Sequence, residues 1–185
     1  MREFSLQPEE SKLAELSEDY WSGMTDTQQD EERRAFEAGQ AILNGDRSLD
    51  TLKVIVHWKS PRIVHHLASN TAEEIKIALD TAVHHSAVTE ALSALQKLHG
   101  VGLPVASAIL TTIYPDRYTV IDFRALESLG YFPQDDLFYL RYLDYCRTLA
   151  QKNIVPPQMS YPAPTALRAL DRALWQWSAK REKTL

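Results

Sequence analysis

Two glycines around one valine, Gly100-Val101-Gly102, are the residues whose type and spacing best suit a ligand. Apolar residues recur at helical spacing before and after them, which predicts two helices joined by a tight turn. Pro104 falls where the first turn of a helix tolerates a missing N–H. Such a turn points backbone N–H groups in one direction and can hold a phosphate oxygen. We therefore expect Gly100, Val101, Gly102 and Leu103 to contact a nucleic-acid backbone.

A second group of polar residues, in the string HWKSPR, combines an aromatic ring with two cations. Trp58 could stack on a base, while Lys59 and Arg62 could hold phosphates. The alternative is that Trp58 fills the core at a helix end and that both cations are solvated. The sequence favours this alternative, because a tryptophan at a helix end usually packs inward.

Asp122 precedes the segment FRALESLG, where an aspartate would cap the N-terminus of a short helix. Arg124 follows two residues later and could contact a phosphate or pair with Asp122. A close pairing would lower the pKa of that carboxyl group. The alternative for Arg124 is a solvated surface side chain.

The remaining candidates for chemistry are histidines and one cysteine. His65-His66 and His84-His85 are adjacent pairs, and neighbours on a helix point about 100° apart, so neither pair chelates a metal by itself. We expect no metal. Cys146 is the only cysteine, so one chain supplies neither a disulfide nor four thiolates for an iron–sulfur cluster, and we interpret it as core filler.

Helical patterns dominate the elements that must position these residues, so we predict an all-α fold. Tyr118–Ile121 is the only strand-like run, and four residues make no sheet. The first two predicted helices cover residues 8–22 and 26–44. Four more begin at Ser48, at Ser60-Pro61, at the Thr71-x-x-Glu74 capping box and at Ser86. After Asp122 we predict a short helix that ends at Gly130, a helix over 135–151 and a last helix that begins at Thr165.

Composition limits the class of protein. The chain has 185 residues, of which 44% are hydrophobic, enough for one core or two small lobes. It has no apolar run of the roughly 18 residues that a membrane span needs and no signal-peptide pattern, so we expect a cytoplasmic protein without membrane contact. Residues 1–50 hold 13 acidic and 5 basic residues, and the other 135 hold 12 and 15. A locally basic face on this acidic chain predicts modest DNA affinity.

Residues 98–130 resemble the helix-hairpin-helix DNA glycosylase superfamily, which includes endonuclease III and the adenine and 8-oxoguanine glycosylases. The matching residues are Leu98, Gly100, Val101 and Gly102 in the hairpin, Ala106 to Leu110 in a helix of small residues, and Val120-Ile121-Asp122 before the next helix. The resemblance implies a two-lobed helical fold. In that fold residues 26–121 form the lobe with the hairpin, and residues 1–25 plus 122–185 form a second lobe packed against it.

The resemblance also implies a function in base-excision DNA repair. Asp122 matches the catalytic carboxylate that stabilises an oxocarbenium-like sugar while the N-glycosidic bond of a flipped base is hydrolysed. DNA would be the partner, contacted by the hairpin and by Lys59, Arg62 and Arg124, while Trp58 and Tyr131 are candidates for the base pocket. No cofactor is expected.

Two departures from the family pattern limit the chemistry. Bifunctional members carry a lysine where this chain has Pro104, which has no amine to form a Schiff base, so a lyase step through that residue is excluded. Arg124 stands where the family has a small polar residue or histidine. Two alternatives therefore remain: a non-catalytic helix-hairpin-helix DNA-binding module, or a protein-interaction domain on the same fold, which the acidic N-terminal region would suit.

Overall fold

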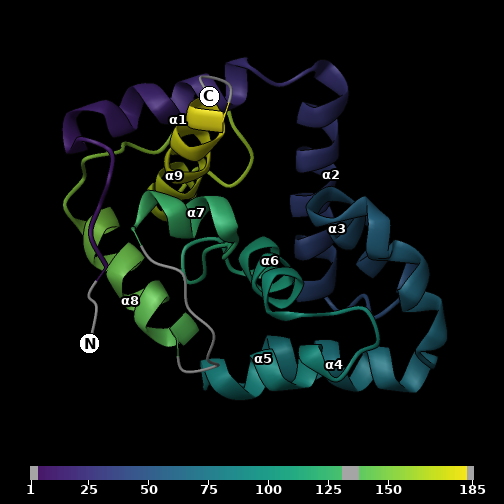
Figure 1. Cartoon of the computed structure of the whole chain (residues 1–185). Coiled ribbons are helices and arrows are strands. Elements are labelled where there is room, and N and C mark those ends of the chain that lie inside the picture. The colour runs from purple at the N-terminus through teal and green to yellow at the C-terminus, as the bar shows by residue number, and fades with distance from the viewer. Residues whose placement is uncertain (1–3, 131–137, 183–185) are drawn as a thin grey trace. The chain divides into compact units, whose positions relative to one another are not determined.

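The computed structural model describes residues 4–130 and 138–182, and this part of the chain is helical without any strand (Figure 1). The all-α prediction is confirmed, and Tyr118–Ile121 lies outside any sheet. In chain order the elements are η1 (Glu10–Lys12), α1 (Leu13–Ser22), α2 (Asp26–Leu43), α3 (Leu49–Lys59), the 3₁₀ helix η2 (Pro61–Ser69), α4 (Ala72–His84), α5 (Val88–Gln96), α6 (Leu103–Ile113), α7 (Phe123–Ser128), α8 (Phe138–Gln151) and α9 (Ala166–Glu182).

The chain divides into two compact units. Unit 1 is formed by Met1–Asp26 and Thr119–Leu185, and unit 2 by Thr27–Tyr118. The hairpin glycines therefore belong to unit 2, whereas Asp122 belongs to unit 1. The division made from the sequence alone placed the two boundaries after residues 25 and 121.

Unit 2 is built around α6, which lies in the middle of its helices (Figure 1). Every residue from Val105 to Ile113 is buried. The hydroxyl groups of Ser107, Thr111 and Thr112 donate hydrogen bonds to carbonyl oxygens of the same helix, at 2.8 Å each. These bonds satisfy the polar side chains, so α6 can be buried on all sides.

Helix α2 approaches α6 at a glycine. A Cβ atom added to Gly39 would lie only 2.2 Å from the carbonyl oxygen of Thr112. The neighbouring Gln40 donates through Nε2 to the carbonyl oxygens of Thr112 and Ile113, at 3.4 and 3.3 Å. Those carbonyls belong to the last turn of α6, where no further helical turn supplies donors. The small residue and the amide therefore fix α2 against the end of α6.

Three of the predicted helix caps are confirmed. Oγ of Ser48 accepts from the N–H of Thr51, Oγ1 of Thr165 accepts from the N–H of Arg168, and Thr71 and Glu74 form both halves of a capping box. Each bond satisfies a backbone donor that has no partner inside its own helix.

Two predicted helix starts are wrong. Ser60 makes no side-chain cap, and Pro61 opens a 3₁₀ helix, not an α-helix. Helix α5 begins at Val88 with Ala87 in the N-cap position, so Ser86 lies outside it. Both elements pack against neighbouring helices, η2 against α3 and α5 against α4 and α6, and a serine offers only a local hydrogen bond in competition with such packing.

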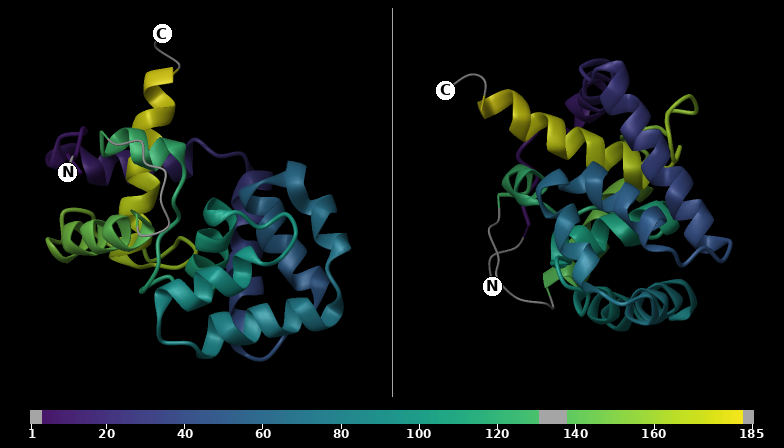
Figure 2. Two further views of the ribbon diagram at one scale, coloured as in Figure 1. Left: turned by 60° about the horizontal axis from the view of Figure 1, so that its bottom comes forward. Right: turned by 90° about the vertical axis from the view of Figure 1, so that its right-hand side faces the viewer.

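Unit 1 is organised by α9, which packs against α1, α7 and α8 (Figure 2). Arg172 of α9 is fully buried, donates to the carbonyl oxygen of Pro162 at 2.7 Å, and lies 5.6 and 5.4 Å from the ring centres of Trp21 and Tyr161. The segment before α9 is thus tied to α1 by an arginine held against two aromatic rings.

Cys146 of α8 is fully buried in unit 1, as predicted for core filler. Burial raises the pKa of its thiol well above the ordinary range, so it stays protonated and is no nucleophile at neutral pH. None of the helices in residues 4–130 and 138–182 combines the length and hydropathy that a membrane span requires.

The contact at Gly39 leads to a prediction about stability. Gly39→Ala should lower the free energy of unfolding by about 2–3 kcal/mol, because the added methyl group must push α2 away from α6. Urea unfolding followed by circular dichroism measures this loss. Glu37→Ala, at an exposed position of the same helix, is the matched control and should change the free energy of unfolding by no more than about 0.5 kcal/mol. Equal stability of the two variants would contradict the close approach.

Candidate functional site

The predicted hairpin is present in unit 2 between α5 and α6. Gly100 adopts a φ of +88°, a left-handed conformation that favours glycine. The N–H of Val101 donates to the carbonyl oxygen of Leu98 at 3.0 Å, and the Val101 side chain is buried. Gly102 occupies the N-cap of α6 in an extended conformation and is exposed. The turn is therefore buried at Val101 and open to solvent at Gly102.

The exposed part of the turn at Gly102 has backbone N–H groups without an acceptor in the described part of the chain. The carbonyl oxygen of Gly102 accepts from the N–H groups of Val105 and Ala106, at 3.0 and 2.9 Å. Pro104 has no N–H. Within the described residues, the N–H groups of Gly102 and Leu103 have no protein acceptor. Two free donors at the positive end of an eleven-residue helix can bind an anion.

The 3₁₀ helix η2 packs against the hairpin at Gly100. A Cβ atom added to Gly100 would lie 2.7 Å from Cβ of His66 and 3.6 Å from the carbonyl oxygen of Ile63. The Asn70 side chain accepts from the N–H of His99 at 2.7 Å and donates to the His99 carbonyl oxygen at 3.1 Å. One amide side chain therefore holds both backbone groups of the residue before Gly100.

Sequence reasoning missed Asn70. Its partner His99 is 29 residues later in the chain, and the only local signal was its place directly before the Thr71 capping box. Contacts at that separation become visible only once η2 and the hairpin are packed together.

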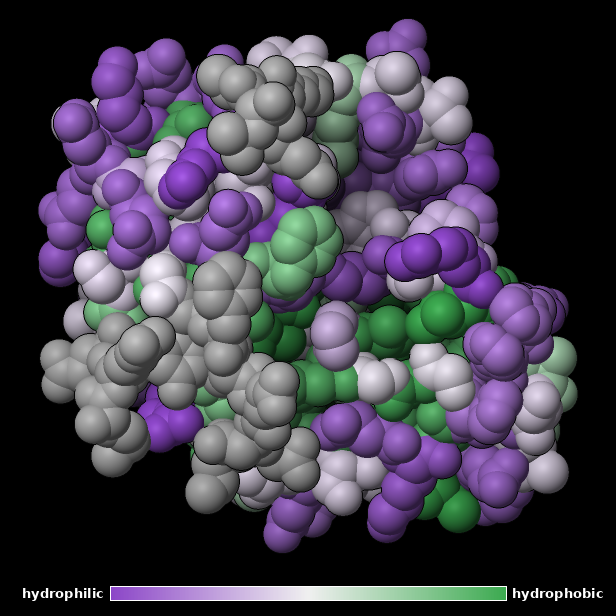
Figure 3. Space-filling model, viewed as in Figure 1, coloured by the Kyte–Doolittle hydropathy of each residue, from purple (hydrophilic) through white to green (hydrophobic). Residues whose placement is uncertain are grey.

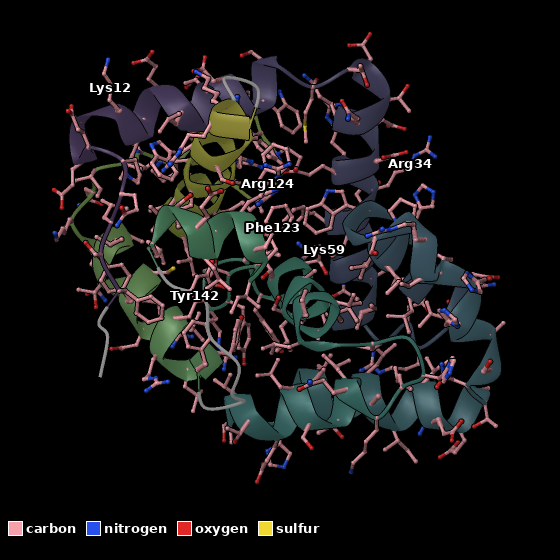
Figure 4. All side chains as sticks on the ribbon, viewed as in Figure 1. Lys12, Arg34, Lys59, Phe123, Arg124 and Tyr142 are labelled. Atoms are coloured by element: carbon pink, nitrogen blue, oxygen red, sulfur yellow. The ribbon has the colours of Figure 1, made fainter. Side chains whose placement is uncertain are left out.

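The cations that were expected to bind DNA beside the hairpin lie at the junction of α3 and η2. Lys59 is the last residue of α3 (Figure 4). Arg62 is exposed in the first turn of η2. Trp58 is half-buried, with its ring centre 5.6 Å from that of Phe36 in an edge-to-face contact. This contact favours the interpretation of Trp58 as a core residue over its role in a base pocket.

Asp122 caps α7 in unit 1, as predicted. Its Oδ1 accepts from the N–H of Ala125 at 3.0 Å, and its own backbone is extended. Buried tyrosines of α8 hold the segment that leads to it: Tyr139 donates to the carbonyl oxygen of Thr119 at 2.8 Å, and Tyr142 to that of Val120 at 2.7 Å. The carboxylate thus sits on a segment fixed at both ends.

The neighbourhood of Asp122 is electrostatically coupled to the α8 tyrosines. Burial raises the pKa of Tyr142 well above its ordinary value, and the negative charges of nearby groups, Asp122 among them, raise it further. Tyr142 therefore remains a neutral hydrogen-bond donor to Val120 over the whole physiological range.

Arg124 lies between two aromatic rings that the sequence did not point to. Its guanidinium carbon is 4.9 Å from the Phe123 ring centre and 5.0 Å from that of Trp175 in α9. Phe123 is 62% exposed, and both side chains extend from α7 (Figure 4). Arg124 is therefore no fully solvated side chain. An exposed ring next to a planar cation can stack on another planar group, such as a nucleobase.

One further hollow belongs to unit 1, an open groove of about 470 Å³ lined by the N-terminal segment, α1 and α9. Ion pairs join its lysines to carboxylates, Lys12 to Glu15 and Lys180 to Asp19. Asp122 is not among the groove-lining residues. Figure 3 shows mainly hydrophilic residues over α1, at the upper left of the view.

The structure thus groups the candidate residues by unit. Hairpin residues Gly100–Leu103 belong to unit 2 with Trp58, Lys59 and Arg62, while Asp122 and Arg124 belong to unit 1. Tyr131 lies outside the described residues. Among residues 4–130 and 138–182, no three His, Cys, Asp or Glu side chains are grouped as metal ligands would be.

No protein-family model, curated protein or solved structure matches this chain significantly.

The two hairpin glycines should respond differently to the same substitution. Gly100→Ala should lower the free energy of unfolding by about 2–3 kcal/mol, because alanine disfavours a positive φ and its methyl group meets Cβ of His66. Gly102→Ala should cost no more than about 1 kcal/mol, the typical loss on placing alanine at an N-cap, since its backbone is extended and the added atom meets only Pro104 Cδ at 3.9 Å. Urea titration of both variants measures the difference, and equal losses would contradict this assignment of the turn.

Proposed function

We propose that this chain is a DNA-binding protein of base-excision-repair type, with the two-lobed helix-hairpin-helix glycosylase fold. Its activity is monofunctional hydrolysis of the N-glycosidic bond of a flipped, damaged base. The products are a free base and an intact abasic site, because Pro104 stands where a Schiff-base lysine would be needed.

One observation carries the proposal, namely the order of elements from α5 to α7. A helix, a Gly-Val-Gly turn, a buried helix of small residues and a short extended segment are followed by an aspartate that opens the next helix. Each feature has a simple structural use by itself. Their combination at the spacing of the glycosylase superfamily favours DNA repair over an unrelated helical protein.

The hairpin would bind a backbone phosphate through the N–H groups of Gly102 and Leu103. Backbone donors that are fixed by a buried helix cost no side-chain entropy when they bind, and the positive end of α6 favours the phosphate charge. Arg62 and Lys59 would add long-range attraction. This contact positions the protein on DNA without reading its sequence.

Asp122 would act on the sugar of the flipped nucleotide. As the glycosidic bond breaks, positive charge develops on the sugar ring, and a fixed carboxylate stabilises that charge and helps to orient a water molecule for attack at C1′. The Phe123 ring and the Arg124 guanidinium, next in the chain, would stack on the extruded base.

A second candidate function is a non-catalytic DNA-binding module on the same fold. The observation that favours it is the bond from Ala125 N–H to Asp122, since a helix cap alone accounts for the aspartate. The hairpin would be used identically in both functions. Excision of a base distinguishes them.

Gly102→Val should weaken DNA binding about tenfold while the chain stays folded. The extended backbone of Gly102 accepts valine, but its side chain covers the N–H groups that would bind phosphate. Fluorescence anisotropy with a labelled duplex at several salt concentrations measures the affinity. Ala87→Val, at the N-cap of α5, is the matched control and should leave it unchanged. Unaltered binding by a folded Gly102→Val chain would remove the hairpin from the DNA contact.

Asp122→Asn separates the two functions that an aspartate can have at this position. Asparagine caps a helix about as well as aspartate, so the melting temperature should stay close to that of the parent. Loss of the charge should slow excision by about 10² or more. The assay uses oligonucleotides with uracil, 8-oxoguanine, alkylated purines or mismatches, cleaved by hot alkali at abasic sites.

The control for this assay is Asp144→Asn, an exposed carboxylate of α8 in the same unit. It should excise at the parent rate. Excision by the Asp122→Asn chain at that rate would contradict the catalytic role, and a parent chain that binds DNA but excises no base from the panel would support the non-catalytic module.

A further inference from the structure

All six histidines of the chain lie in unit 2, between His57 and His99. Unit 2 also holds 11 acidic and 9 basic residues, which give a formal charge of −2 with neutral histidines. Protonation of all six would change that charge to +4. The sign of the net charge of the unit that carries the hairpin therefore depends on how many of its histidines are protonated.

Three of these histidines form one cluster beside the hairpin. The ring centres of His65 and His66 are 4.0 Å apart, and those of His66 and His99 are 5.2 Å apart. His66 lies directly under Gly100, and His99 precedes Gly100 in the chain. The three imidazoles thus lie next to the turn that leads to Gly102 and Leu103.

The rings keep hydrogen-bonding capacity for a ligand. His99 uses Nδ1 in a 3.1 Å contact with the carbonyl oxygen of His66, which fixes the orientation of its ring. Within the described residues, Nε2 of His99 and both ring nitrogens of His65 and His66 have no protein hydrogen-bond partner. His65 and His99 are exposed, and His66 is half-buried.

The surroundings of His66 favour its neutral form. Desolvation lowers the pKa of His66 below its ordinary value of 6.5, and repulsion from His65 and then His99 lowers it further. Because the fold favours neutral His66, stability is lost as pH falls below about 6.5. An anion held between the rings would reverse that preference.

The charged groups on the elements around the cluster do not supply such an anion. Near η2 and the hairpin, the end of α3 contributes His57 and Lys59, and the chain after α5 contributes Lys97. Helix η2 itself contributes Arg62, so none of these groups is a carboxylate. Lys53 is paired with Asp50. On α4, Glu74 is bound to Thr71 in the capping box and Glu73 is exposed. No carboxylate is among the groups that shift the pKa of His66.

We propose that His65, His66 and His99 form a proton-coupled phosphate-binding surface that extends the hairpin contact to the DNA backbone. A backbone phosphate next to the one at Gly102 and Leu103 binds to the imidazolium groups, and the cluster takes up protons from solvent as it binds. This inference rests on the DNA-binding part of the proposed function and is independent of base excision. It explains how an acidic chain gains positive charge where the phosphates lie.

The first test uses inorganic phosphate as the probe and needs no DNA. Imidazole proton resonances of the full chain are titrated by NMR in phosphate and in chloride at equal ionic strength. Phosphate should raise the pKa of His66 and His99, while that of His84, at the end of α4, should not move. The proposal would be overturned if neither the pKa of His66 nor that of His99 differed between phosphate and chloride.

The second test measures the affinity for a labelled duplex between about pH 7.5 and pH 6.0 at constant ionic strength. One coupled proton changes affinity by up to about tenfold per pH unit. The parent should tighten by about tenfold or more over this range. His65→Gln should lose a measurable part of that gain, and the double variant His66→Gln, His99→Asn most of it. The side-chain amide introduced by His99→Asn keeps a donor for the carbonyl oxygen of residue 66.

Controls keep this result separate from folding and from the proposed function. His84→Gln should retain the full pH dependence, and His65→Gln removes an exposed ring that makes no hydrogen bond, so the hydrogen bonds of the turn are kept. The inference is overturned if the full pH dependence of DNA affinity remains in both His65→Gln and the double variant. It is also overturned if His84→Gln loses as much of that pH dependence as the double variant does. In either case the proposed DNA binding is not contradicted. Proton-coupled binding without base excision supports the inference and contradicts the enzymatic function alone.

Discussion

The burial of α6 is the constraint on which the rest of unit 2 depends. A helix buried from Val105 to Ile113 must satisfy its own polar side chains, and its three hydroxyl residues do so by donating back to carbonyl oxygens of their own helix. Its last carbonyls are bound by Gln40, and its close contact with α2 requires Gly39. With the helix fixed in this way, its N-terminus is also fixed. The donors at Gly102 and Leu103 are therefore held in place by the core, which is what preorganised binding of an anion requires.

In unit 1 the corresponding role belongs to α9. Ser128 donates to a carbonyl oxygen of α9 at Leu174, and Trp175 packs against Arg124, so the short α7 is attached to the longer helix along its length. A six-residue helix has little stability by itself. Its attachment to α9 keeps Asp122 at a defined position, and a rigid carboxylate is equally useful as a cap and as a stabiliser of developing charge. The local geometry is thus compatible with both functions, so a measurement of excision, not of fold, has to separate them.

The sequence predicted those parts of the fold that depend on local physics. The caps at Ser48, Thr71 and Thr165 follow from short-range hydrogen bonds, and the hairpin follows from a glycine that must adopt a positive φ. Ser60 failed as a cap because the path of η2 is set by its packing on α3 and on Gly100, which no local pattern encodes. Asn70 and Trp175 were missed for the same reason. Their partners lie 29 and 51 residues away, where only the folded chain brings them together.

The acidic composition, which by itself opposes DNA binding, has a different significance once the hairpin is seen in atomic detail. Lysine and arginine bind DNA largely by displacing condensed counterions, and that contribution falls as salt rises. Backbone N–H groups at a helix end carry no net charge, so their hydrogen bonds to phosphate depend much less on salt. Imidazoles gain positive charge as the pH falls, and a bound anion favours their charged form. A protein that binds phosphate through backbone N–H groups and imidazoles attracts DNA only weakly at long range. Its affinity therefore depends on direct contact between the hairpin and the phosphate. If the chain binds DNA as proposed, its net charge of −5 would therefore limit non-specific encounters with DNA more than the contact made by the hairpin.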